Sequence, residues 1–167
     1  MTATAVPLAE AAHFQARTDD GQLIGPFNAV LLSPDIASSF MQLQYAEAQH
    51  TSLTERTRQV VILTVGAVWQ AAYELYAHSA AGRQAGLSDD AIATLAGGGL
   101  PSDLSDGEQV AQRVAWALLV EHRIDESLYR EADAAFGNRG VMDIVFLVGI
   151  YHTTCAMLNA FGIPAPG

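Results

Sequence analysis

Apolar residues recur three and four positions apart through most of the chain beyond about residue 26, which is the spacing of amphipathic helices. The clearest run follows Thr54, and its apolar and small residues are Val60, Val61, Leu63, Thr64, Ala67 and Val68. No segment shows the sustained alternation of apolar and polar residues that is typical of strands. The pattern therefore predicts an all-α fold.

Residues that start and stop helices divide this pattern into segments. Ser33 followed by Pro34 predicts the start of a helix that runs to about Gln49. Ser105 and Glu108 have the spacing of a capping box. The other helices are predicted to begin at about Thr54, Ala71, Ser88, Asp125 and Arg139. Glycines that suit helix ends follow several of them, at Gly86, Gly97 and Gly137.

The segment from about Arg139 to Phe161 is apolar on nearly every face. We therefore expect it at the buried centre of the fold or in an oligomer interface. Its most apolar run, 144–151, is too short to span a bilayer. Residues 1–25 have no clear period and lack the features of a signal peptide, so we expect a loose arm. The expected organisation is this arm followed by one helical domain over 26–167.

Composition narrows the classes of function. The net charge of −10 argues against nucleic acid and anionic membranes, which both require clustered cations. Half of the residues are hydrophobic and 16% are charged, which favours a homo-oligomer. All eight basic residues are arginine, so lysine Schiff-base chemistry is impossible. Cys155 is the single cysteine, which excludes a C-x-x-C pair and a disulfide-dependent secreted protein. We expect a cytoplasmic protein.

Candidate chemistry lies in the segment 69–78, WQAAYELYAH. Glu74 and His78 are four residues apart, so on a helix they share a face, where a carboxylate and an imidazole can exchange a proton. Tyr73 and Tyr76 lie beside them, and the small and aromatic neighbours suit the wall of a pocket. The alternative is that Glu74 is a solvated helix residue and His78 a hydrogen-bonded packing residue.

His152 is the other histidine in an informative place, because it lies on the apolar final segment. It is either a core histidine bonded to a backbone carbonyl or a residue that faces His78 across a pocket. In the second case Glu74, His78 and His152 would make three ligands of a metal site. No fourth ligand is evident, so we predict no metal.

Six pieces of sequence, in order, resemble the carboxymuconolactone decarboxylase-like family, part of the superfamily of alkylhydroperoxidase D-type proteins. They are GPFNAVLLSP (25–34), LTERTRQVVIL (53–63), YELYAH (73–78), AGLSD (85–89), FGNRGVMD (136–143) and YHTTCAMLNAFGIP (151–164). The resemblance covers residues 25–166. It implies a single-domain helical bundle that assembles as a homo-oligomer, a trimer or hexamer.

Two departures from the family's pattern bear on the chemistry. Thiol-active members of the superfamily carry a C-x-x-C whose second cysteine lies four residues before the histidine. Those positions here are Ala71 and Glu74, so thiol peroxidase activity is not expected. Many members have a glutamate where this chain has Gln59, which keeps hydrogen-bonding capacity but removes a proton acceptor. Glu74 and His78 are therefore the remaining candidates for catalytic residues.

The resemblance implies a cofactor-free, lyase-type enzyme that acts on a small lactone or carbonyl compound. Glu74 and His78 would be catalytic, and the residues contacting the substrate would be Gln59, Tyr73, Tyr76 and His152. Decarboxylation, ring opening and C–C cleavage all need proton transfer next to a carbonyl. A dianionic substrate would recruit arginine, so this acidic chain favours a neutral or singly charged one. The alternative is a non-catalytic helical protein that keeps the fold for assembly or small-molecule binding.

Overall fold

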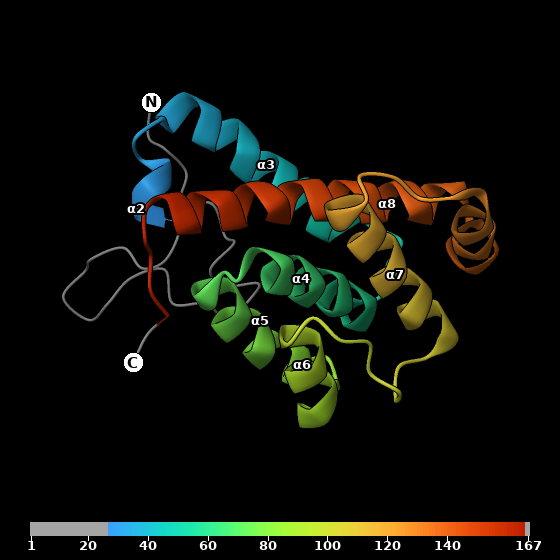
Figure 1. Cartoon of the computed structure of the whole chain (residues 1–167). Coiled ribbons are helices and arrows are strands. Elements are labelled where there is room, and N and C mark those ends of the chain that lie inside the picture. Colours follow the sequence, from blue (N-terminus) through green and yellow to red (C-terminus); the bar gives the residue numbers. More distant parts are fainter. Residues whose placement is uncertain (1–26, 166–167) are drawn as a thin grey trace.

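A computed structural model describes residues 27–165, and within that range the chain forms helices and no strands (Figure 1). The helices are α2 (Phe27–Val30), α3 (Pro34–His50), α4 (Glu55–Trp69), α5 (Ala72–Gln84), α6 (Asp89–Ala96), α7 (Asp106–Val120) and α8 (Glu126–Ala160). The expected all-α class is confirmed. The arm expected over 1–25 lies outside the described residues.

The helices begin where side chains satisfy the free backbone N–H groups of their first turn. At α7 the Ser105 hydroxyl accepts from the Glu108 N–H, and the Glu108 carboxylate accepts from the Ser105 N–H, which completes the predicted capping box. Side-chain oxygens also cap α4, α6 and α8, from Thr54, Ser88 and Asp125. Pro34 begins α3, but no side chain caps that helix.

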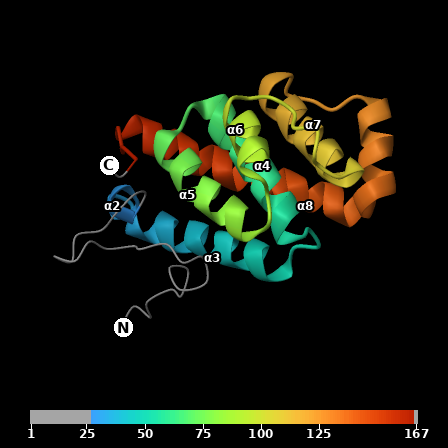
Figure 2. The same cartoon turned by 90° about the horizontal axis from the view of Figure 1, so that it is seen from below.

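Helix α4 is the buried centre of the fold. Its residues 57–66 are all buried, because α5, α6, α7 and α8 pack around it. Figures 1 and 2 show α4 beside the long helix α8, with α5 and α6 along its other side. One apolar cluster joins α4 to α7 and α8, and it includes Ile62, Val114 and Leu147. A second joins α4 to α6 and includes Leu63 and Leu95.

Helix α8 consists of two helices that meet at Gly137. The backbone there has φ 65° and ψ 169°, a conformation that side chains with a Cβ rarely adopt. We expected one helix to end at Gly137 and another to begin near Arg139, and the break lies at that point. The second part then runs through the core to Ala160, and Gly162 follows with φ 58°.

The second part of α8 has one buried and one exposed apolar face. Ile144 and Leu147 are fully buried, whereas Met142, Val145 and Phe146 are exposed in the single chain. By length and composition alone α8 could cross a membrane, with a mean hydropathy of 1.7 over its most apolar stretch. Because its inner face packs on α4 and α7, we interpret it as the central helix of a bundle.

Helix α3 lies on the outside of the bundle, and none of its 17 residues is buried. Figure 2 shows it running alongside the bundle beneath α8. The loop after it is anchored to α8, since Asp143 Oδ2 accepts from both the N–H and the hydroxyl of Ser52 at 2.7 Å. Arg139 also donates to the His50 carbonyl at 2.7 Å.

We predict that Leu147→Ala lowers the free energy of unfolding by about 2–5 kcal/mol, because it empties space in the main core. Leu100→Ala is the matched control, since it removes the same atoms from an exposed side chain. Urea denaturation of both variants measures the difference. Equal effects would contradict the place given to α8 in the core.

Candidate functional site

Helix α5 brings Glu74 and His78 together on the face that it turns toward α4. His78 Nε2 lies 2.9 Å from Glu74 Oε1, and the two residues are only 5% and 3% exposed. This separation is an ion-pair distance between a carboxylate oxygen and a ring nitrogen. Apart from this contact with His78, Glu74 Oε1 has no hydrogen-bond partner within the described residues. A buried carboxylate oxygen in this position is available for proton exchange with the imidazole.

The other ring nitrogen of His78 contacts α4. His78 Nδ1 lies 2.8 Å from Gln59 Oε1, and Gln59 Nε2 donates to Glu55 Oε1 at 2.5 Å. Both ends of the Gln59 amide are therefore engaged, and the residue is 2% exposed. The spacing of Glu55 and Gln59 on α4 repeats that of Glu74 and His78 on α5, so two i,i+4 pairs meet across the helix interface.

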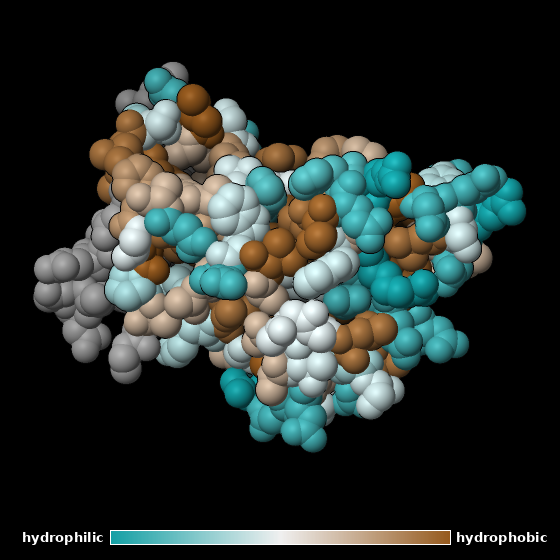
Figure 3. All heavy atoms as spheres, in the orientation of Figure 1, coloured by the Kyte–Doolittle hydropathy of each residue, from teal (hydrophilic) through white to brown (hydrophobic). Residues whose placement is uncertain are grey.

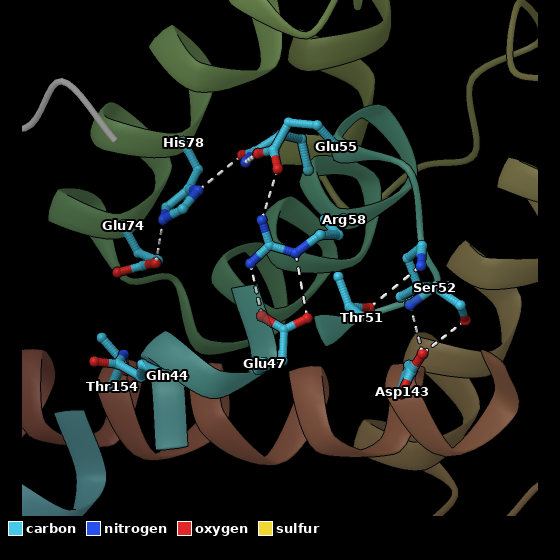
Figure 4. A network of polar contacts seen from close by, with 12 residues as sticks. Gln44, Glu47, Thr51, Ser52, Glu55, Arg58, Glu74, His78, Asp143 and Thr154 are labelled. Atoms are coloured by element: carbon cyan, nitrogen blue, oxygen red, sulfur yellow. Dashed lines mark hydrogen bonds and ion pairs between the residues drawn. The ribbon is translucent and has the colours of Figure 1, made fainter. Parts of the chain in front are cut away.

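Arg58 continues this polar network toward α3 (Figure 4). It donates to Glu47 at 2.6 and 3.2 Å and to Glu55 Oε2 at 2.6 Å. Burial disfavours the charged guanidinium, but the hydrogen bonds and charge of Glu47 outweigh it and raise the pKa of Arg58. Burial likewise favours neutral Glu55, but Arg58 and Gln59 hold the pKa of Glu55 below its usual value.

Two tyrosines border the pair. The Tyr151 ring meets the His78 ring edge to face, with centroids 5.0 Å apart. Tyr73 is buried beside Leu158 and Ala77. Burial, together with the nearby Glu74 carboxylate, raises the pKa of both phenols. Their hydroxyls therefore stay protonated and can serve as hydrogen-bond donors at neutral pH.

The remaining residues from the sequence analysis lie elsewhere. Tyr76 is 55% exposed. His152 is also exposed, and its Nδ1 accepts from the Trp69 indole N–H at 3.1 Å. It is Tyr151, and not His152, that contacts His78. The metal trio that the sequence left open is not assembled, since no cluster of three or more His, Cys, Asp or Glu forms within residues 27–165.

Cys155 is fully buried in the main core. Burial first, and the Glu74 charge second, raise the pKa of its thiol. The thiolate that nucleophilic or redox chemistry requires is therefore disfavoured. The position matches the sequence-based interpretation of Cys155 as a small packing residue.

The arginines nearest the site in sequence are all paired. Arg58 bonds Glu47 and Glu55 as described, Arg56 bonds Glu108 and the Gly86 carbonyl, and Arg83 bonds Asp89. A substrate carboxylate would have to compete with these partners. This arrangement agrees with the inference from composition that the site suits a neutral or singly charged compound.

The residues that complete the network were not predicted from the sequence. Glu47 lies on α3 and Tyr151 lies on α8. Neither has a helical spacing to the residues of α5, so nothing in the sequence indicated that they would meet them. Glu55 had a detectable signal, because it lies four residues before Gln59.

The sequence matches the family model described as the carboxymuconolactone decarboxylase family over residues 34–117, which spans α3 to α7. The chain belongs to the carboxymuconolactone decarboxylase family. The matched region contains Glu55, Gln59, Glu74 and His78. No curated protein matches the sequence.

Solved structures share the fold. The alkylhydroperoxidase AhpD core of a peroxidase-related protein from Ralstonia eutropha has a TM-score of 0.78 at 18% identity, over 95% of this chain and 81% of that one. A protein of unknown function from Agrobacterium tumefaciens, described as a candidate AhpD antioxidant defence protein, has a TM-score of 0.76 at 17% identity, over 84% and 97%. The debrominase Bmp8, solved with 2,3,4-tribromopyrrole, has a TM-score of 0.76 at 13% identity, over 99% and 94%. These identities show the AhpD-like fold alone.

We predict that Arg58→Met lowers the free energy of unfolding by about 3–5 kcal/mol, because it leaves the buried Glu47 carboxylate without its cation. The exposed pair of Arg113 and Glu131 is the control, and Arg113→Met should cost about 0–1 kcal/mol. Chemical denaturation at neutral pH measures both. Similar losses would show that the Arg58 network is no more important than a surface ion pair.

Proposed function

We propose that the chain is a cofactor-free acid/base enzyme of the carboxymuconolactone decarboxylase family that acts on a small lactone or carbonyl compound. One observation carries the proposal, namely the buried contact between His78 Nε2 and Glu74 Oε1 at 2.9 Å. A carboxylate and an imidazole that share a proton out of water form an acid/base pair, and this pair lies inside the region matched by the family.

The chemistry that suits the pair is proton transfer to or from carbon next to a carbonyl. When a carboxylate leaves as CO₂, its bonding electrons delocalise into the carbonyl, and an acid must then protonate the carbon. Glu74 and His78 would supply that proton, and the protonated phenol of Tyr73 or Tyr151 would donate to the carbonyl oxygen. Ring opening and C–C cleavage beside a carbonyl use the same steps.

A small, neutral or singly charged ring compound is the substrate class that we favour. The nearby arginines are engaged with carboxylates, which disfavours a dianion. The debrominase of the same fold was solved with a brominated pyrrole, so this architecture can hold a small ring. Thiol peroxidase chemistry is not proposed, because Ala71 and Glu74 stand at the positions of the two cysteines.

The second candidate is a non-catalytic role in assembly or small-molecule binding. The observation in its favour is the depth of burial of Glu74 and His78, with Tyr151 packed on the imidazole. Under this alternative the pair only stabilises the interface of α4 and α5. A thermal-shift screen of small lactones, β-keto acids and enones finds a starting ligand, since a binder stabilises the folded state by mass action. Turnover of that ligand then separates the two functions.

We predict that His78→Ala and Glu74→Gln each reduce turnover of a confirmed substrate by about 10²–10⁴-fold. Cys155→Ser is the control, and it should keep near-wild-type turnover because its buried thiol takes no part. Steady-state kinetics give the result, and circular dichroism checks the fold of each variant. Retained turnover in both site variants would reject the catalytic assignment.

We also propose that the chain forms a homo-oligomer, a trimer or hexamer, through α2, α3 and the outer face of α8. Apolar side chains gather at the end of the molecule that carries α2 and the start of α3 (Figure 3). Leu31, Leu32 and Ile36 are more than half exposed there. A further exposed group on α8 is formed by Met142, Val145 and Phe146. Groups of exposed apolar side chains are typical of subunit interfaces.

We predict that Phe146→Glu reduces the solution mass toward that of one 17.7 kDa chain. Val120→Glu is the control on α7, because both side chains are 47% exposed. Size-exclusion chromatography with light scattering measures the masses. A wild-type monomer across a wide concentration range would overturn the proposed assembly.

A further inference from the structure

Glu55 sets the orientation of the Gln59 amide. Glu55 Oε2 accepts from Arg58, and its Oε1 faces Gln59 at 2.5 Å. The pKa of Glu55 is held below its usual value, so near neutral pH the group is a carboxylate that can only accept hydrogen bonds. The Gln59 atom opposite it must therefore be the amide nitrogen. This assignment follows from donor and acceptor chemistry, independently of how the amide oxygen and nitrogen are distinguished.

The oriented amide in turn decides which nitrogen of His78 carries a proton. With its nitrogen toward Glu55, Gln59 presents Oε1 to His78 Nδ1 at 2.8 Å. An amide oxygen only accepts hydrogen bonds, so Nδ1 must carry the proton. Arg58, Glu55, Gln59 and His78 thus form one chain in which every hydrogen bond is donated toward the Glu55 carboxylate, from Arg58 on one side and from His78 through Gln59 on the other.

The opposite nitrogen is left for exchange with Glu74. Nε2 lies 2.9 Å from Glu74 Oε1, and an unprotonated nitrogen facing a carboxylate at that distance would be repelled. The pair therefore holds one further proton, either on Glu74 beside neutral His78 or on Nε2 beside the carboxylate. That proton is the one the site can transfer, since the Nδ1 proton is held by Gln59.

We infer that Glu55 and Gln59 are positioning residues that lock His78 in its Nδ1-protonated form and direct Nε2 toward Glu74. For its catalytic consequence the inference rests on the proposed function, but the protonation state itself does not. It also gives Gln59 a role that an ionised glutamate could not fill here, because two carboxylates at 2.5 Å would repel each other.

The sharpest test is Glu55→Gln, which keeps the shape of the side chain but adds a donor. Arg58 can only donate, so the new amide would turn its oxygen to Arg58 and its nitrogen to Gln59. Gln59 would then turn its own nitrogen to His78, and Nδ1 would have to become an acceptor. The two hydrogen bonds that Gln59 makes, with residue 55 and with His78, are expected to reverse, with the neutral imidazole protonated on Nε2.

Long-range ¹H–¹⁵N correlation spectra of histidine-labelled protein report the protonation of each ring nitrogen. The spectrum of His78→Gln identifies the His78 signals among the five histidines. In a pH series we expect wild-type Nδ1 to stay protonated after the ring becomes neutral, and Glu55→Gln to show an unprotonated Nδ1. The control Glu131→Gln removes an exposed carboxylate that also pairs with an arginine, and it should match the wild type.

The spectra test the positioning role, and the kinetics test the proposed function. An unprotonated Nδ1 in the wild type, or an unchanged Nδ1 in Glu55→Gln, overturns the positioning role. If Glu55→Gln does not fold, Glu55→Ala provides the second variant, because it frees the Gln59 amide and should yield a mixture of the two ring forms. A wholly Nδ1-protonated ring in that variant would equally overturn the inference. Loss of turnover in His78→Ala tests the proposed function alone, and its result does not depend on the spectra.

Discussion

The buried guanidinium of Arg58 is the constraint on which the polar interior depends. A charge taken out of water must be paired and hydrogen-bonded, and Glu47 and Glu55 together satisfy that requirement. The pair with Glu47 ties the outer helix α3 to the central helix α4, although α3 buries no residue of its own. The pair with Glu55 sets the direction of the hydrogen bonds that reach His78. Arg58 therefore contributes both to the packing of α3 on α4 and to the hydrogen bonds that set the protonation of His78.

The fold and the chemistry of this protein are separable. The chain shares its helical architecture with peroxidase-related proteins and with a debrominase at 13–18% identity. Its own site has a carboxylate where thiol-active relatives have a cysteine, and burial raises the pKa of its single thiol. A scaffold that positions residues four apart on α5 against α4 can hold different pairs of side chains there. In this chain those side chains are Glu74 and His78.

Much of the local structure was readable from the sequence. Capping residues and glycines predicted the helix starts at Thr54, Ser88, Ser105 and Asp125 and the break at Gly137, because those signals act within one turn. The contact of Glu74 with His78 follows from i,i+4 spacing in the same way. The resemblance to the family added Gln59, which the structure places against His78.

Only the tertiary structure decided which residue of a neighbouring helix reaches the site. Consecutive helix residues differ in direction by about 100°, so a single step along α8 separates Tyr151, which meets His78, from His152, which bonds Trp69. The packing of α8 on α4 selects between them, and nothing local in the sequence encodes that choice. The same holds for Glu47, which lies 11 residues before Arg58 and meets it only because α3 folds back along the bundle. Local spacing determined the pairs within each helix, and packing between helices determined the network that joins them.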